Sequence, residues 1–320
     1  MRGHKRIFVE DEFQHIYHRS IDQVLIFYTM EDRLVYYTLF SVLANHYKIT
    51  VLALALMFDH AHSLIKAPDL DSMSRFIGTT LSRYTMAFNS DSGRKGPLFE
   101  KAFGNAVKKG DKKVRTCIAY IGNNSVEKEL YTRAEDDPWN CLAYIGSDHP
   151  FSNPIVKAKA SRKLLQSLEV VKRYHKRNCY LEYPVIRRLF YGLNVEEQAQ
   201  LFDFIMSTYL PIDKTTLLGY YKGYDEMIYS INSNTGSEYD IKERNDPESH
   251  MNYVKMLEIT KRSSFSADPR SIILASDSKK WEIAEKLQSL TGARPYQIKR
   301  FLHLTKKQNR NTLMSSQITV

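Results

Sequence analysis

Residues 58–66 of this 320-residue chain read Phe58-Asp59-His60-Ala61-His62-Ser63-Leu64-Ile65-Lys66. They complete an apolar run that begins at Val51, and the pattern predicts the second strand of a tight hairpin. Successive side chains of a strand point to opposite faces, so His60 and His62 share one face while Ala61 and Ser63 point away from it. Two imidazoles side by side on a rigid strand can bind one metal ion. The alternative is a pair of hydrogen-bonded polar residues at the end of a strand.

The segments around this strand predict an α+β fold. Residues 12–20 have the composition of a first strand, and residues 31–47 carry the apolar stripe of a helix. A second helix is expected over residues 71–89, a fourth strand over 103–109 and a third helix over 111–124. This order is typical of a ferredoxin-like antiparallel sheet with helices on one face. A linker near residue 150 then separates a first domain, residues 1–150, from a mostly helical second domain, residues 151–320.

The charge of the chain is unevenly distributed. Residues 1–150 hold 19 Lys and Arg against 18 Asp and Glu, whereas residues 151–320 hold 27 against 18. The excess of positive charge in the second part favours a polyanionic partner, most often nucleic acid. The longest apolar run is far shorter than the roughly 20 residues that span a membrane, and three widely spaced cysteines indicate neither a disulfide framework nor a zinc site. We therefore expect a cytoplasmic protein without a membrane partner.

Tyr120 and Asn124 lie four residues apart in the third predicted helix. That spacing places both side chains on one face of a helix. If this face packs beside His60 and His62, two imidazoles and one amide oxygen would surround a divalent ion next to a tyrosine nucleophile. The alternatives are a core aromatic residue at position 120 and a helix C-terminal residue at position 124.

Four motifs in a fixed order carry a resemblance to a known family. They are His60-Ala61-His62, Gly96-x-Leu98-Phe99-x-x-x-Phe103, Tyr120-Ile121-x-x-Asn124, and Pro138-Trp139 followed by Tyr144-Ile145-Gly146. On these motifs, residues 10–147 resemble the REP-associated tyrosine transposases of the single-tyrosine HUH endonuclease superfamily, which includes the transposases of single-strand insertion sequences.

The resemblance implies a function for the motifs. It implies a transposase-like, metal-dependent endonuclease and strand transferase that acts on single-stranded DNA through a covalent 5′-phosphotyrosine intermediate. In this family pattern Tyr120 would be the nucleophile, and His60, His62 and Asn124 would bind Mg²⁺ or Mn²⁺. The expected partner is single-stranded or hairpin DNA, and the protein would act as a monomer or a homodimer.

The sequence departs from the family pattern at two places. Phe58 and Asp59 stand where the family has proline and asparagine. Asp59 either adds negative charge near the metal or caps the turn, and we favour the cap. Asn123 stands where the family has an apolar residue, so either Asn123 or Asn124 could be the third ligand, and the four-residue spacing favours Asn124. The nearby His15 and His18 are expected to be structural or to contact DNA.

DNA contacts are predicted in both halves of the chain. Residues 281–304 have the pattern of a helix-turn-helix with its turn at Gly292, although an ordinary helical hairpin is the alternative. The residues of its second helix that would contact DNA are Arg294, Tyr296, Gln297, Lys299 and Arg300, with Lys306, Lys307 and Arg310 on phosphates. In the first domain the predicted contacts are Arg75, Arg83, Arg94, Lys95 and Arg115.

Two other functions stay open at this point. One is a catalytically inactive DNA-binding regulator derived from such an enzyme, in which the histidine pair would be blocked. The other is a metal phosphoesterase without covalent chemistry, which would cleave DNA without Tyr120.

Overall fold

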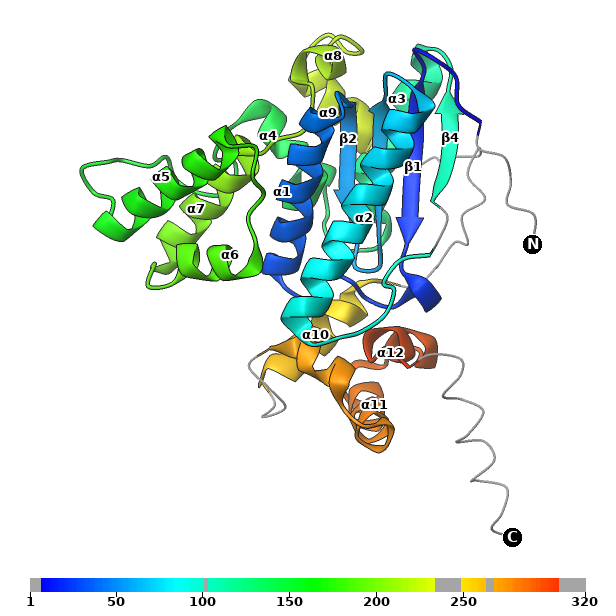
Figure 1. The fold of residues 1–320 in the computed structure, drawn as a ribbon, viewed down its shortest axis with the longest axis vertical. Coiled ribbons are helices and arrows are strands. Elements are labelled where there is room, and N and C mark those ends of the chain that lie inside the picture. Colours follow the sequence, from blue (N-terminus) through cyan, green and yellow to red (C-terminus); the bar gives the residue numbers. More distant parts are fainter. Residues whose placement is uncertain (1–6, 101–102, 234–248, 263–267, 305–320) are drawn as a thin grey trace.

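The computed structural model describes residues 7–100, 103–233, 249–262 and 268–304. Its central feature is a sheet of four strands, β1 (Phe13–Arg19), β2 (Thr50–Leu56), β3 (His60–Lys66) and β4 (Gly104–Lys108) (Figure 1). The order across the sheet is β2-β3-β1-β4, and each neighbouring pair is antiparallel. With one helix between β1 and β2 and one between β3 and β4, this is a ferredoxin-like arrangement. The predicted α+β class and antiparallel sheet are confirmed.

Helices cover both faces of the sheet. α1 (Met30–His46) and α2 (Leu70–Ser92) pack together on one face, where the Tyr36 hydroxyl of α1 lies 2.7 Å from Nε2 of His18. α3 (Asp111–Glu127) covers the other face, where the Tyr120 ring centroid lies 5.7 Å from that of His15. His15 and His18 are an odd number of residues apart on β1, so they point to opposite faces. The one-sided arrangement expected from the sequence therefore describes α1 and α2, and α3 adds a layer on the opposite face.

The second half of the chain is helical, as predicted. Among the described residues, no helix combines the length and the apolarity needed to cross a bilayer. The helices that follow α3 are α4 (Ala143–Gly146), α5 (Arg162–Lys176), α6 (Tyr183–Phe190), α7 (Val195–Thr208), α8 (Lys214–Leu218), α9 (Tyr224–Asn232), α10 (Met251–Arg262), α11 (Asp277–Thr291) and α12 (Pro295–Phe301).

These helices pack against the first half of the chain at several places. α6 lies beside α1, and α9 lies beside α3. The α3–α9 contact is close at Gly122, where an added Cβ would lie 3.1 Å from side-chain atoms of both Ile231 and Leu142. α12 is held by the loop before α1, because the Tyr28 hydroxyl donates to the Phe301 carbonyl. One continuous core includes residues of both halves, and the domain boundary near residue 150 stays a prediction.

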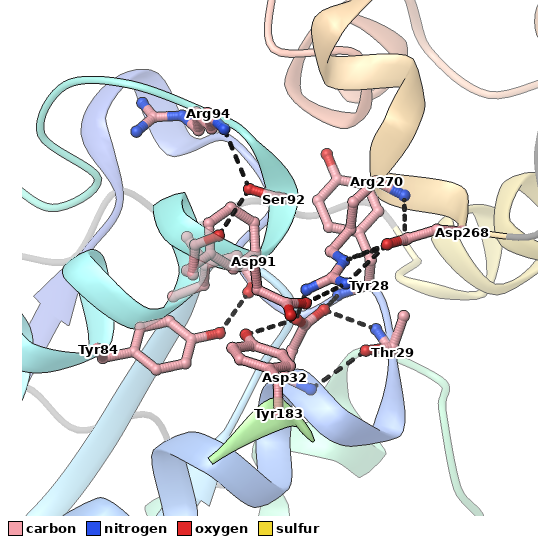
Figure 2. Close-up of polar contacts among 12 residues, drawn as sticks. Tyr28, Thr29, Asp32, Tyr84, Asp91, Ser92, Arg94, Tyr183, Asp268 and Arg270 are labelled. Carbon is pink, nitrogen blue, oxygen red and sulfur yellow. Dashed lines mark hydrogen bonds and ion pairs between the residues drawn. The ribbon is translucent and has the colours of Figure 1, made fainter. Parts of the chain in front are cut away.

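A buried ionic network joins these layers on the α1 face (Figure 2). The Arg270 side chain is 2% exposed and lies 3.0 Å from Asp32 of α1, 2.7 Å from Asp91 at the end of α2, and 2.7 Å from Asp268. The Tyr183 hydroxyl of α6 donates to Asp32 at 2.8 Å. Buried charges are tolerated only when they are paired and hydrogen-bonded, so this network fixes the second half of the chain to α1 and α2.

Candidate active site

The two histidines of β3 lie on one face of the sheet, as the strand alternation requires. Their ring centroids are 4.8 Å apart and the rings are nearly perpendicular, with 89° between their planes. His60 is 8% exposed and His62 is 1% exposed. The hairpin that precedes them is held at its turn, because the amides of Ile26 and Phe27 both donate to the Phe58 carbonyl. The pair is therefore held on a well-anchored strand.

Tyr120 reaches this face from α3. Its ring centroid lies 5.7 Å from that of His62 in an edge-on arrangement with 87° between the planes. It lies at the same distance, 5.7 Å, from the ring of His15. Tyr120 is partly exposed, so its phenol is not enclosed in an apolar interior. A strand and a helix about sixty residues apart in sequence thus bring imidazoles and a phenol together.

Each histidine of the pair is oriented through its Nδ1 atom. His60 Nδ1 lies 2.6 Å from Asp59 Oδ1, and His62 Nδ1 lies 3.0 Å from Nε2 of His15. Burial opposes ionisation of Asp59, but His60, together with His250 and Arg300, more than offsets this and holds the pKa of Asp59 below its usual range. Nε2 of each ring is then the nitrogen that a metal ion would bind, with Asp59 and His15 as the orienting partners that metal-ligating histidines commonly have. These two imidazoles fit a divalent metal site.

The neighbouring asparagines of α3 have different surroundings. Asn123 is buried, and its amide nitrogen donates to the Ile231 carbonyl of α9. Asn124 donates from Nδ2 to the Tyr120 carbonyl at 2.9 Å, which leaves Oδ1 as its possible metal ligand atom. Asn124 lies inside α3, which continues to Glu127, so it is not a helix-terminal cap. Within the described ranges no group of three His, Cys, Asp or Glu side chains could hold a metal, and a set of two imidazoles and one amide is a different kind of site.

Comparison with known families covers the part of the chain that carries this geometry. Residues 15–124 match the family of IS200-like transposases. The match confirms the family resemblance for this segment, which contains His60, His62, Tyr120 and Asn124. A solved structure, titled as a REP-associated tyrosine transposase bound to a REP hairpin, is similar with 15% identity and a TM-score of 0.36. The similarity covers 44% of this chain and 82% of that one, and no curated protein matches the chain.

Three residues that the sequence did not assign to the site lie around the histidines. They belong to residues 15–124, which we call the IS200-like segment after its family match. Asp59 and His15 orient the pair, as described above. Tyr17 lies directly opposite His62 in the β1–β3 register, and their ring centroids are 6.5 Å apart. The Tyr17 ring extends over β4 at Gly104, where an added Cβ would lie 2.0 Å from the ring. The available signal was the alternation of β1, which puts His15 and Tyr17 on the same face as each other.

The basic residues predicted to contact DNA from the IS200-like segment have distinct environments. Arg115 is paired with Glu226 of α9 at 3.0 Å. Arg94 donates to the carbonyls of Gly96 at 3.0 Å and Pro97 at 2.8 Å, so it stabilises its own loop. Arg75 forms an exposed pair with Asp71. Arg83 and Lys95 are exposed, but Arg75 and Arg83 belong to α2 and therefore lie on the face of the sheet opposite the histidines. Their contact with DNA stays a prediction.

The helical hairpin predicted near residues 281–304 is present as α11 and α12. Gly292 ends α11 with a left-handed φ of 65°, and Arg294, Tyr296 and Lys299 are exposed or partly exposed. Gln297 is wrong as a DNA-facing residue, because its side chain is fully buried and bonds to Asn252 and to the Ser249 carbonyl.

The other end of this hairpin is held against the IS200-like segment. The side chain of Arg300 donates to Gln23, and the Arg300 carbonyl accepts from the Leu25 amide. Lys306, Lys307 and Arg310 lie outside the described residues. The helix-turn-helix function stays a prediction, with Arg294, Tyr296 and Lys299 as its remaining surface residues.

Proposed function

We propose that this protein is a DNA endonuclease and strand transferase that cleaves single-stranded DNA with Tyr120 as its nucleophile. The observation that carries the proposal is the position of the partly exposed Tyr120 ring, 5.7 Å from His62 on the histidine face of the sheet. The match of residues 15–124 to the IS200-like transposases supports DNA as the substrate and transposition or recombination as the class of reaction.

His60, His62 and Asn124 would hold the divalent ion, Mg²⁺ or Mn²⁺. The support for this set is that Asp59 and His15 engage the Nδ1 atoms of the two rings, which directs Nε2 toward an ion. When bound, such an ion neutralises charge on the phosphate oxygens in the transition state and favours ionisation of a nearby hydroxyl.

The residues of the chain would act as follows. The Tyr120 phenol, an unreactive nucleophile at its ordinary pKa of about 10, loses its proton and its oxygen forms a bond to the scissile phosphorus. The bond from phosphorus to the 3′ oxygen breaks, and that oxygen takes up a proton to become a free 3′-OH. The 5′ end is then linked to Tyr120 as a phosphodiester. Attack by another 3′-OH reverses the step and joins the strands without ATP, because the energy of the broken bond is kept in the phosphotyrosine.

Adduct formation tests this proposal directly. The protein is incubated with Mn²⁺ and a hairpin-bearing single-stranded oligonucleotide, and the covalent complex is measured by denaturing electrophoresis. We expect the native protein and Tyr229→Phe, which alters an exposed tyrosine 74% accessible on α9, to form the adduct. Tyr120→Phe should form none, a loss of at least about a thousandfold, because the substitution removes the oxygen that forms the bond to phosphorus.

The same experiment separates the other two functions. Cleavage that survives Tyr120→Phe would assign the protein to the metal phosphoesterases. Binding of the oligonucleotide by the native protein without any cleavage would assign it to the DNA-binding regulators. The position of Tyr120 beside His62 favours the enzyme over the regulator.

A further inference from the structure

Most of the excess positive charge of the second half lies in one helical hairpin. Residues 157–191 hold ten Lys and Arg against two Asp and Glu, a net charge of +8, whereas the whole of residues 151–320 carries +9. The segment includes α5, the connection after it and α6. The helix-turn-helix candidate is thus not the main source of the charge. Charge concentrated in this way repels itself, and a bound polyanion relieves the repulsion.

Four of these charges form a stripe along the outer side of α5. Arg162, Arg173, Lys176 and Arg177 are all exposed. At about 100° per helical residue they fall within an arc of roughly 100°. The buried residues of α5 lie on the opposite side of the helix, at Leu164, Ser167, Leu168 and Val171. The packing of α5 against α7 and α6 therefore turns the basic side outward.

One acidic side chain lies on the same side of α5 as the stripe. It is Glu169, which is paired with Lys172 at 2.8 Å and also attracts Arg173, so it offsets only part of the positive charge. In α6, Arg187 is paired with Asp91. Within the part of the chain that the structure describes, none of the four stripe residues forms an ion pair. An exposed Lys or Arg without an acidic partner is able to neutralise a phosphate.

The shape of the stripe selects the kind of polyanion. α5 has 15 residues and is about 22 Å long at 1.5 Å per residue. Each strand of a duplex carries one phosphate per about 3.4 Å of helix axis, so α5 can contact several phosphates. Binding of single strands usually adds aromatic rings on which bases stack. The aromatic residue of α5, Tyr174, is partly buried and packs against the core. In Figure 1, α5 projects at the side of the molecule, away from the sheet, where a rigid duplex has access.

We propose that the stripe of Arg162, Arg173, Lys176 and Arg177 binds the phosphate backbone of double-stranded DNA, without reading its sequence. The duplex would be the paired part of a hairpin-bearing DNA. The inference rests on the proposed function only in taking DNA as the polyanion.

The test compares two full-length variants of equal charge. In the stripe variant, Arg162, Arg173, Lys176 and Arg177 are replaced by Gln. In the control, four exposed lysines from other places, Lys48, Lys222, Lys255 and Lys261, are replaced by Gln. The affinity for a blunt DNA duplex is measured by fluorescence anisotropy over a range of salt concentrations. Circular dichroism melting verifies that both variants fold.

The stripe variant should bind duplex at least about tenfold more weakly at about 0.1 M salt. The magnitude of its slope of log K against log salt should fall by about 3.6, since each of the four phosphate contacts contributes about 0.9. The control should change the slope by less than about 1. Equal slopes in the two variants would overturn the proposal, as would a stripe that binds anionic lipid vesicles and not DNA.

A second measurement keeps this proposal separate from the proposed function. The stripe variant should still form the Tyr120 adduct on a short unpaired oligonucleotide, because the stripe does not contribute to the histidine face. If the native protein forms no adduct but loses duplex binding on stripe substitution, the duplex surface holds and the nuclease proposal fails. If the native protein forms the adduct but stripe substitution leaves duplex binding unchanged, the nuclease proposal holds and the duplex surface fails.

Discussion

Two histidines of β1 show how differently the two faces of one sheet are used. His18 points to the α1 face, where it is 4% exposed and bonds to the Tyr36 hydroxyl. The pKa of His18 is lowered from 6.5 to about 3, mainly by burial and to a smaller extent by the neighbouring His62 and His60. His18 therefore stays neutral. His15 points to the α3 face and bonds to His62 beside Tyr120. One face is a sealed core, and the other brings together imidazoles and a phenol.

The largest difference between the faces should appear when one histidine from each is replaced. His62→Ala removes a predicted metal ligand, so we expect Mn²⁺-dependent adduct formation to fall by more than about a hundredfold, beyond the effect typical of losing an orienting partner. His18→Gln should leave the adduct rate per folded molecule within about threefold. Its main effect should be on the free energy of unfolding, which should fall by about 1–3 kcal/mol because a buried hydrogen bond is disturbed. Adduct kinetics and urea denaturation of both variants measure the two effects. Equal adduct rates in the two variants would contradict the assignment of the faces.

The sealed face should be sensitive to its ionic network. Arg270→Met leaves Asp32 buried without a cation, whereas Asp91 keeps its pair with Arg187, so the free energy of unfolding should fall by about 3–5 kcal/mol. The control Arg75→Met breaks an ion pair whose partners are 68% and 71% exposed, and it should change stability by less than about 1 kcal/mol. Chemical denaturation measures both. A similar small change in the two variants would show that the network is not stabilising.

A smaller effect is expected at the carboxylate that orients His60. Asp59→Asn weakens the interaction with His60 Nδ1, so the affinity for Mn²⁺ should fall by about 10–100-fold. Isothermal titration of Mn²⁺ measures this without any DNA. The control Asp71→Asn changes an exposed carboxylate of α2 and should leave the affinity unchanged. If the two variants bind Mn²⁺ equally, Asp59 is only the turn cap that the sequence favoured.

The most gradual effect is a loss of stability at acid pH. Burial lowers the pKa of His303, which contacts the Leu25 carbonyl, to about 3, as it does for His18. Both stay neutral in the folded protein but take up a proton in the unfolded chain below about pH 6.5. The unfolded state then binds more protons, so the free energy of unfolding should fall by up to about 1.4 kcal/mol per pH unit for each histidine. Urea titrations from about pH 7 to 4.5 should show a shallower decline in His303→Gln than in the native protein.

Local pattern was sufficient for the elements and for the main motifs. The alternation of β3 placed His60 and His62 on one face, and the four-residue spacing placed Tyr120 and Asn124 on one side of α3. The order of strands and helices indicated the ferredoxin-like sheet. These features follow from the repeat of a strand or a helix, which depends only on residues near one another in sequence.

Contacts between distant segments were decided only by tertiary structure. The sequence did not show that His15 orients His62, that Arg270 is enclosed by three carboxylates, or that Gln297 is buried under α10. A polar or charged residue has the same local signal whether it faces DNA, solvent or another element. Which of these it meets depends on the packing of elements that may be hundreds of residues apart, as Tyr28 and Phe301 are.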